Sequence, residues 1–224
     1  GQRGGRQTAA RREPIPPRVF YVAAVFGLIT MFVMPAYINL SIFVSPISPY
    51  STVAAVVQVL YSVGNMFGGL CFMIQYRYCK RYSMGVSCLI MCAGLVMMLT
   101  ASTLPVMCGA MLVAGFGYGG LMPASLMITG AVTKPSQTAL ATSIVFIGMN
   151  VLGFLATPFA GIIGSITGDA LTAPVLTGTA AIFVIGIVIM VAKPFPAEQN
   201  RESGSEQTSG TLDHVYGGKE GSET

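Results

Sequence analysis

Charged residues are scarce through most of this sequence. Between positions 19 and 192 the only charged side chains are Arg77, Lys80, Arg81, Lys134 and Asp169. Soluble domains carry about 25% charged residues, whereas this chain has 9% charged and 53% hydrophobic residues. Such a chain cannot cover a surface that faces water. We therefore predict a membrane protein whose solvent is the lipid bilayer.

Histidine and carboxylates are lacking where chemistry inside a membrane would need them. The single histidine, His214, lies near the end of the chain, and no carboxylate lies inside an apolar segment. Intramembrane metalloproteases and serine hydrolases need such metal ligands or bases. We therefore expect no enzyme, no metal site and no cofactor. Cys88 and Cys92 share one helix face, and we expect them to pack rather than to bind metal.

Six apolar segments have the length that a membrane-spanning helix requires, about 20 residues. Apolar residues occupy all faces of each segment, which indicates spans rather than surface helices. The predicted fold is an all-α bundle of six transmembrane helices over residues 18–192. Residues 1–17 and 193–224 are polar and lack an apolar period, so we expect disordered cytosolic segments there. The six segments are 19–44, 53–74, 84–103, 104–132, 138–163 and 174–192.

The cations of the chain fall on one side of these spans. All 12 lysines and arginines precede the first span or follow the second, fourth and sixth. Under the positive-inside rule this side is cytosolic, so both termini are predicted in the cytosol. The net charge of +4 belongs to these connections. It gives no reason to expect a nucleic-acid partner.

The connection after the second segment carries a recognisable pattern. In "GNMFGGLCFMIQYRYCKRYS", glycines are followed by three cations and then by a new apolar segment. The stretch resembles the loop motif that joins the second and third helices of each six-helix half in the major facilitator superfamily. The resemblance implies that Gly68 and Gly69 allow close helix contact and that Arg77, Lys80 and Arg81 act at a cytosolic gate. The alternative is that these cations only anchor the topology.

The fifth segment extends this resemblance. Its run "TALATSIVFIGMNVLGFLATPFAGIIG" is similar to the eleventh helix of the superfamily. Six helices after a basic segment resemble the C-terminal half of a twelve-helix transporter, over about residues 18–192. The resemblance implies a missing N-terminal half, with residues 1–17 as a remnant of the central loop.

Glycine pairs predict close contacts between helices. Gly64 with Gly68 and Gly115 with Gly119 both have GxxxG spacing. Gly153, Thr157 and Gly161 repeat small residues every four positions in the fifth segment. Gly115, Gly117 and Gly120 also spell G-x-G-x-x-G, but a dinucleotide site needs a preceding strand and a later acid, which this context lacks.

Three prolines lie inside the predicted spans. Pro35, Pro123 and Pro158 each remove a backbone hydrogen bond and are expected to kink their helices. A static kink and a bend used in alternating access both remain open interpretations.

Four neutral polar side chains are predicted at the same depth. Thr30, Asn65, Tyr118 and Asn150 each lie about midway along their segments, the level at which transporters hold substrate. Alternatively, the two asparagines bond each other or a carbonyl freed by proline and join helices together. The resemblance implies that Thr30 and Tyr118 line the cavity, whereas Asn65 and Asn150 face the other half.

The function predicted from these features is secondary active transport of a small solute, by alternating access around a midplane site. The chain is expected to be a multi-pass protein of the cell membrane, and to act as such a transporter or as the C-terminal half of one. Expected partners are a small-molecule substrate, the bilayer, and the missing N-terminal half or a second copy. The alternative is a six-span scaffold or accessory subunit that transports nothing.

Overall fold

The computed structural model describes residues 15–48, 50–79 and 82–192, and within these ranges its regular secondary structure is helical. The prediction of an all-α bundle is confirmed. Five helical stretches are long and apolar enough to cross a membrane, and the sixth, α4, is shorter at 17 residues. The predicted terminal segments lie outside the described residues. The helices are α1 Pro17–Ile38, α2 Leu40–Val44, α3 Ser51–Cys79, α4 Ser83–Leu99, α5 Leu104–Val132, α6 Thr138–Phe154, α7 Ala156–Thr167 and α8 Thr172–Ala192.

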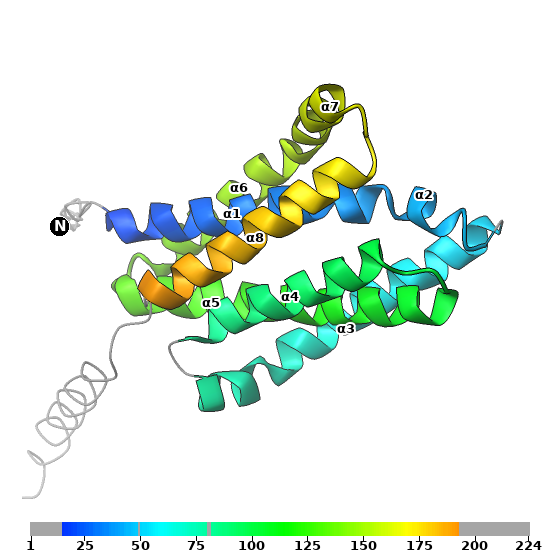
Figure 1. Ribbon diagram of the computed structural model, residues 1–224. Coiled ribbons are helices and arrows are strands. Elements are labelled where there is room, and N and C mark those ends of the chain that lie inside the picture. Colours follow the sequence, from blue (N-terminus) through cyan, green and yellow to red (C-terminus); the bar gives the residue numbers. More distant parts are fainter. Residues whose placement is uncertain (1–14, 49, 80–81, 193–224) are drawn as a thin grey trace, which may run out of the picture.

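The ends of the helices follow the alternation expected of membrane spans (Figure 1). The start of α1, the turn between α3 and α4, the turn between α5 and α6, and the end of α8 lie at one end of the bundle. The described cations Arg18, Arg77 and Lys134 belong to these segments, so we call this the basic end. The other end holds the connections that lack lysine and arginine.

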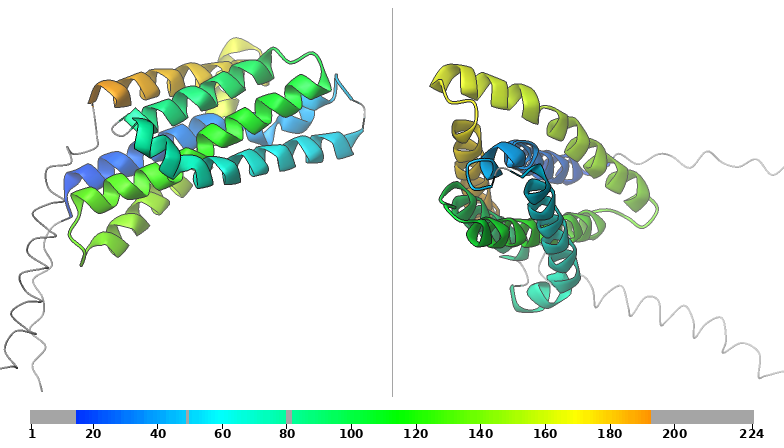
Figure 2. Two further views of the ribbon diagram at one scale, coloured as in Figure 1. Left: turned by 90° about the horizontal axis from the view of Figure 1, so that it is seen from below. Right: turned by 90° about the vertical axis from the view of Figure 1, so that its right-hand side faces the viewer.

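Helix α5 lies at the centre of one side of the bundle and packs against both α3 and α4. Helix α4 in turn contacts α8, α8 contacts α1, and α1 contacts α6. In the end-on view of Figure 2, α6 and α7 cross on the outer side of α1. Helices α3 and α6 therefore flank the bundle and leave much of their surface uncovered.

The first predicted span is interrupted rather than continuous. Pro35 lies inside α1, and the backbone N–H and the side-chain Nδ2 of Asn39 both donate to the Pro35 carbonyl, at 3.2 and 3.0 Å. Asparagine side chains compete in this way with the helical hydrogen-bond ladder. The helix ends at Ile38, and α2 starts again at Leu40.

The fifth predicted span is interrupted as well. Pro158 lacks the N–H that would bond the Phe154 carbonyl, and the chain tightens instead, with Leu155 N–H donating to the Leu152 carbonyl at 3.1 Å. Helix α7 begins at Ala156, so Pro158 lies in its first turn, where a missing N–H is tolerated. The expected mid-span kink is therefore a break before Pro158. Pro123, in contrast, lies inside the continuous helix α5.

Two other boundaries differ from the sequence prediction. Helix α3 extends five residues past 74 to Cys79, so Arg77 lies in its last helical turn rather than in a loop. Helix α4 stops at Leu99 instead of 103 because Thr100 bonds back to the preceding turn, its hydroxyl donating to the Val96 carbonyl at 3.1 Å.

The turn between α7 and α8 depends on one glycine and one carboxylate. Gly168 ends α7 with φ 73°, a left-handed conformation that favours glycine. The N–H groups of Leu171 and Thr172 donate to Asp169 Oδ1, each at 2.9 Å, and satisfy the start of α8. These two bonds hold the pKa of Asp169 below its ordinary value, and the bond from Thr172 has the larger effect.

We expect this turn to loosen on acidification. Because the pKa of Asp169 is lowered in the folded state, its stabilisation is present above the ordinary carboxyl pKa and is lost as pH falls through the lowered value. NMR titration of a 13C-labelled Asp169 carboxyl should give a pKa below that of an aspartate peptide. Asp169→Asn should keep the bonds without the titration, and an ordinary carboxyl pKa would contradict the capping role.

Candidate functional site

Thr30 of α1 and Tyr118 of α5 meet inside the bundle. Thr30 is 3% exposed, and its Oγ1 donates to the Phe26 carbonyl at 3.0 Å. Since the hydroxyl of Thr30 has one hydrogen, the 3.3 Å contact between Thr30 Oγ1 and Tyr118 Oη is made by Tyr118 donating. The oxygen of Tyr118 therefore keeps free lone pairs that can accept a further hydrogen bond.

Four rings extend this contact into a chain, which we call the aromatic ladder: Tyr37, Tyr61, Tyr118 and Phe26. The ring centroids of Tyr37 and Tyr61 lie 5.2 Å apart, those of Tyr61 and Tyr118 6.3 Å, and those of Tyr118 and Phe26 6.4 Å. These separations are typical of interacting aromatic pairs. The ladder joins three helices, α1, α3 and α5.

The position of Tyr61 beside Tyr118 depends on the crossing of α3 and α5. Four glycines, Gly64, Gly68, Gly115 and Gly119, form this glycine crossing. A Cβ added at Gly115 or Gly119 would meet the backbone carbonyl of Tyr61 or Asn65, and one at Gly64 or Gly68 would meet that of Leu112 or Phe116. The predicted GxxxG contacts are thus made between these two helices, and the backbones touch.

The two candidate asparagines lie apart and have different surroundings. Asn65 is half-buried, and no hydrogen bond to its side chain is found in the described part of the chain. Asn150 is exposed, and its Nδ2 donates to the Phe146 carbonyl of its own helix at 2.7 Å. The suggestion that the asparagines bond each other or a proline-freed carbonyl is therefore wrong.

The outer face of α6 and α7 carries a polar stripe formed by Ser143, Asn150 and Thr157. Ser143 and Asn150 are seven residues apart and so share one face of α6, Thr157 follows in the first turn of α7 after the break, and all three side chains are exposed. The expected small-residue packing of this span holds only at Gly153, where an added Cβ would lie 3.3 Å from Thr30 Cγ2. Gly161 faces open space, so the remainder of that prediction is wrong.

The candidate residues of the loop motif have different surroundings. Gly68 presses against the Phe116 backbone, whereas Gly69 has only a loose approach, 3.6 Å from the Gly119 carbonyl to an added Cβ. Arg77 is exposed at the end of α3. Lys80 and Arg81 lie outside the described residues.

A side chain that the sequence analysis did not select ties the α3–α4 hairpin together. Gln75 Nε2 donates to the Ser83 carbonyl at 3.0 Å and to Ser87 Oγ at 2.9 Å. Gly120 of α5 leaves room for this contact, since a Cβ there would lie 2.6 Å from Ser87 Oγ. A glutamine inside an apolar run, followed by two serines four residues apart, was the available signal.

The described residues contain no group of three His, Cys, Asp or Glu side chains that could hold a metal ion. Cys92 is buried, and its thiol donates to the Thr179 carbonyl at 3.6 Å, a helix-packing contact. The G-x-G-x-x-G residues lie within α5 and are buried against α3 and α4. What the site offers is hydroxyl, amide and aromatic groups.

The bundle has six spans that alternate in direction. A polar contact joins the first and fourth spans at mid-depth, and the glycine crossing joins the second and fourth. The sequence profile of the Major Facilitator Superfamily matches residues 19–215. The chain belongs to this superfamily. It is therefore an integral multi-pass membrane protein of a family of transporters rather than enzymes, with small molecules as substrates. No curated protein matches the chain.

Within this superfamily transporter, the structure brings together only part of the predicted set. Thr30 and Tyr118 are in contact, Asn65 is one helical turn from Tyr61 in α3, and Asn150 faces outward. The ladder was not predicted from the sequence, although Phe26, Thr30 and Tyr37 recur at intervals of four and seven residues. That spacing places the three side chains on one face of α1.

Proposed function

We propose that this superfamily member is a secondary transporter that moves a small solute by alternating access around a site between α1 and α5. The observation that carries the proposal is the Thr30–Tyr118 contact, which links these helices at mid-depth. Transporters commonly hold substrate at this level. Tyr118 keeps lone pairs free to accept from a solute, because its hydrogen is directed to Thr30.

The proposal includes a second six-helix bundle, either as another part of a longer chain or as a second copy. The polar stripe supports it, because Ser143, Asn150 and Thr157 would otherwise face lipid. Ser143 and Asn150 each donate one hydrogen bond to a carbonyl of their own helix, but the second N–H and the carbonyl oxygen of the Asn150 amide are unfavourable in hydrocarbon unless a partner helix bonds them. Asn65 and the exposed face of α3 would meet the same bundle, and we place the assembly in the cell membrane.

The test is solute flux in proteoliposomes that contain the full transporter. Asn150→Ala should lower transport about threefold or more, since an interhelical hydrogen bond in a membrane contributes on the order of 1 kcal/mol. Membrane insertion should be unchanged. Thr177→Ala, an exposed polar position on α8, is the matched control and should transport normally.

Two results would contradict this proposal. Wild-type flux in Asn150→Ala would remove Asn150 from the interface between bundles. A correctly assembled protein that moves no solute in either direction would favour the alternative of a six-span scaffold.

A further inference from the structure

The aromatic ladder contains polar groups that the bundle does not satisfy. Within the described part of the chain, no hydrogen bond is found to the hydroxyls of Tyr37 and Tyr61 or to the amide of Asn65, one helical turn from Tyr61, and none of these groups is fully buried. A polar group in an apolar environment is costly unless water or a ligand bonds it. Tyr37, Tyr118 and Asn65 are partly exposed, so a molecule outside these helices can reach them.

The spacing of the rings determines how such a molecule can lie. A flat ring inserted between two others needs centroids about 7 Å apart, two contact distances of about 3.5 Å. The Tyr37–Tyr61 and Tyr61–Tyr118 separations of 5.2 and 6.3 Å are shorter. A ligand therefore does not insert between these rings and stacks instead on the two tyrosines that are partly exposed, Tyr37 and Tyr118. Tyr61, 8% exposed, supports them from behind.

The charge around the ladder restricts the ligand further. Between positions 19 and 76, and again between 82 and 133, the sequence contains no charged residue and no histidine. The helices that form the ladder thus carry no counter-charge near it. A charged solute would lose its hydration there without an ionic partner from these helices, which is strongly unfavourable.

From these observations we propose that the solute is a small uncharged molecule with a flat ring and a hydrogen-bonding edge. The ring stacks on Tyr37 and Tyr118, and the edge bonds the free hydroxyls and the Asn65 amide. This inference rests on the proposed transport function and names the class of solute.

Three probes that share one pyridine ring and differ in charge test the proposal. They are nicotinamide, which is uncharged, nicotinate, an anion, and 1-methylnicotinamide, a cation. Equilibrium dialysis against the full transporter in nanodiscs, with empty nanodiscs subtracted, should show saturable binding of nicotinamide. The two charged probes should bind at least about tenfold more weakly.

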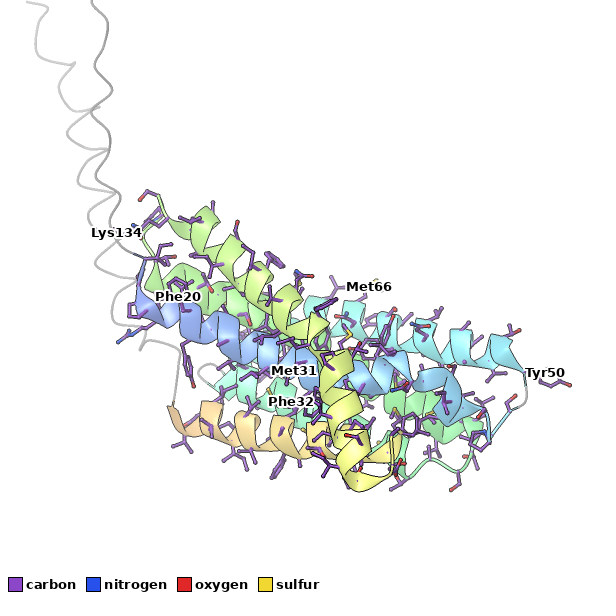
Figure 3. The ribbon with its side chains drawn as sticks, turned by 90° about the horizontal axis from the view of Figure 1, so that it is seen from above. Phe20, Met31, Phe32, Tyr50, Met66 and Lys134 are labelled. Atoms are coloured by element: carbon purple, nitrogen blue, oxygen red, sulfur yellow. The ribbon has the colours of Figure 1, made fainter. Side chains whose placement is uncertain are left out.

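Variants of the ladder complete the test. Tyr37→Leu should weaken nicotinamide binding about tenfold through loss of stacking, and Tyr37→Phe, which keeps the ring, about threefold through loss of the hydroxyl. Tyr37 is suitable because it is only half-buried. Tyr50→Leu is the control: this side chain is 73% exposed, away from the ladder, and projects from the bundle at the end opposite Lys134 (Figure 3).

The proposal is overturned if none of the probes binds, if a charged probe binds best, or if Tyr37→Leu binds nicotinamide like the wild type. Counterflow of glucose, which is uncharged but not flat, separates this failure from failure of the transport function. Glucose flux that is insensitive to Tyr37→Leu leaves the transport function standing and rejects the flat-ring solute. No probe binding, together with no flux of any solute through the correctly assembled protein, rejects both.

Discussion

Replacing Gly119 with valine is expected to separate α3 from α5 and to abolish transport. A Cβ at this position would lie 2.8 Å from the carbonyl carbon of Asn65 and 2.9 Å from its Cα. These are backbone atoms of another helix, so no side-chain rotation can relieve the overlap. Overpacking of this kind costs about 3 kcal/mol, and the shift of α3 would also move Tyr61 away from Tyr118. Thermal unfolding in detergent and solute flux should both report the loss.

The matched control is Gly109→Ala in the same helix. An added Cβ at Gly109 meets nothing within 4 Å. Alanine favours a helix over glycine by about 0.5–1 kcal/mol, so this variant should be as stable as the wild type or slightly more stable. Equal stability of Gly119→Val and Gly109→Ala would show that the glycine crossing does not hold the two helices together.

Replacing Tyr118 with alanine is expected to have the largest effect on transport that leaves the bundle inserted. The ring of Tyr118 contacts both Phe26 and Tyr61, so its removal divides the aromatic ladder. Truncation of a fully buried aromatic side chain costs about 3–5 kcal/mol, and Tyr118, which is partly exposed, falls at the low end of this range. If half of that is lost from solute binding, about 1.5 kcal/mol, transport efficiency falls about tenfold or more. Uptake kinetics, normalised to inserted protein, measure this change.

Two conservative variants separate the hydroxyl from the ring. Tyr118→Phe and Thr30→Val each remove the contact at 3.3 Å and should each lower transport about threefold to tenfold. Since they remove the same bond, the double variant should be little worse than either single variant. Additive losses would show that Thr30 and Tyr118 act separately, and wild-type kinetics in Tyr118→Ala would remove Tyr118 from the site.

The fold class was predictable because it depends on composition and on the position of charge. A run of about 20 apolar residues has few alternatives in lipid, since each backbone group must be bonded within its own helix. The glycine pairs were also readable, because a residue without Cβ at every fourth position is a local property of one helix. Accordingly, the helices form as predicted, and both glycine pairs make the predicted close backbone contacts with another helix.

The helix interruptions were not predictable from apolar runs. Kinks were expected at Pro35 and Pro158. The structure instead has a break at Leu155 before Pro158, and the first span is interrupted at Asn39, between α1 and α2. Whether a helix bends or breaks near a proline depends on which side-chain or backbone group bonds the carbonyls of that helical turn. The backbone N–H and the side-chain amide of Asn39 both donate to the Pro35 carbonyl. The hydropathy of the sequence does not predict these bonds.

For the candidate site residues, the depth of a side chain in the membrane could be predicted from the sequence, but the direction in which it points could not. The depth of a side chain follows from its position along a helix at 1.5 Å per residue, and Thr30 and Tyr118 do meet. The direction of a side chain depends on how each helix is rotated against its neighbours. Asn150 therefore faces outward although it lies at a similar position along its span, and Tyr37 and Tyr61 join the ladder unforeseen.

The sequence by itself determined that the chain crosses the bilayer, where its spans lie, and on which side its cations fall. Each of these follows from transfer of residues between water and lipid, which is summed along the chain and needs no neighbours. Only the tertiary structure decided that α3 and α5 cross at four glycines and that three tyrosines from three helices form one ladder. It also placed the polar stripe on the outside. Those outcomes depend on helix rotation and backbone approach, which are set by packing between segments distant in the chain.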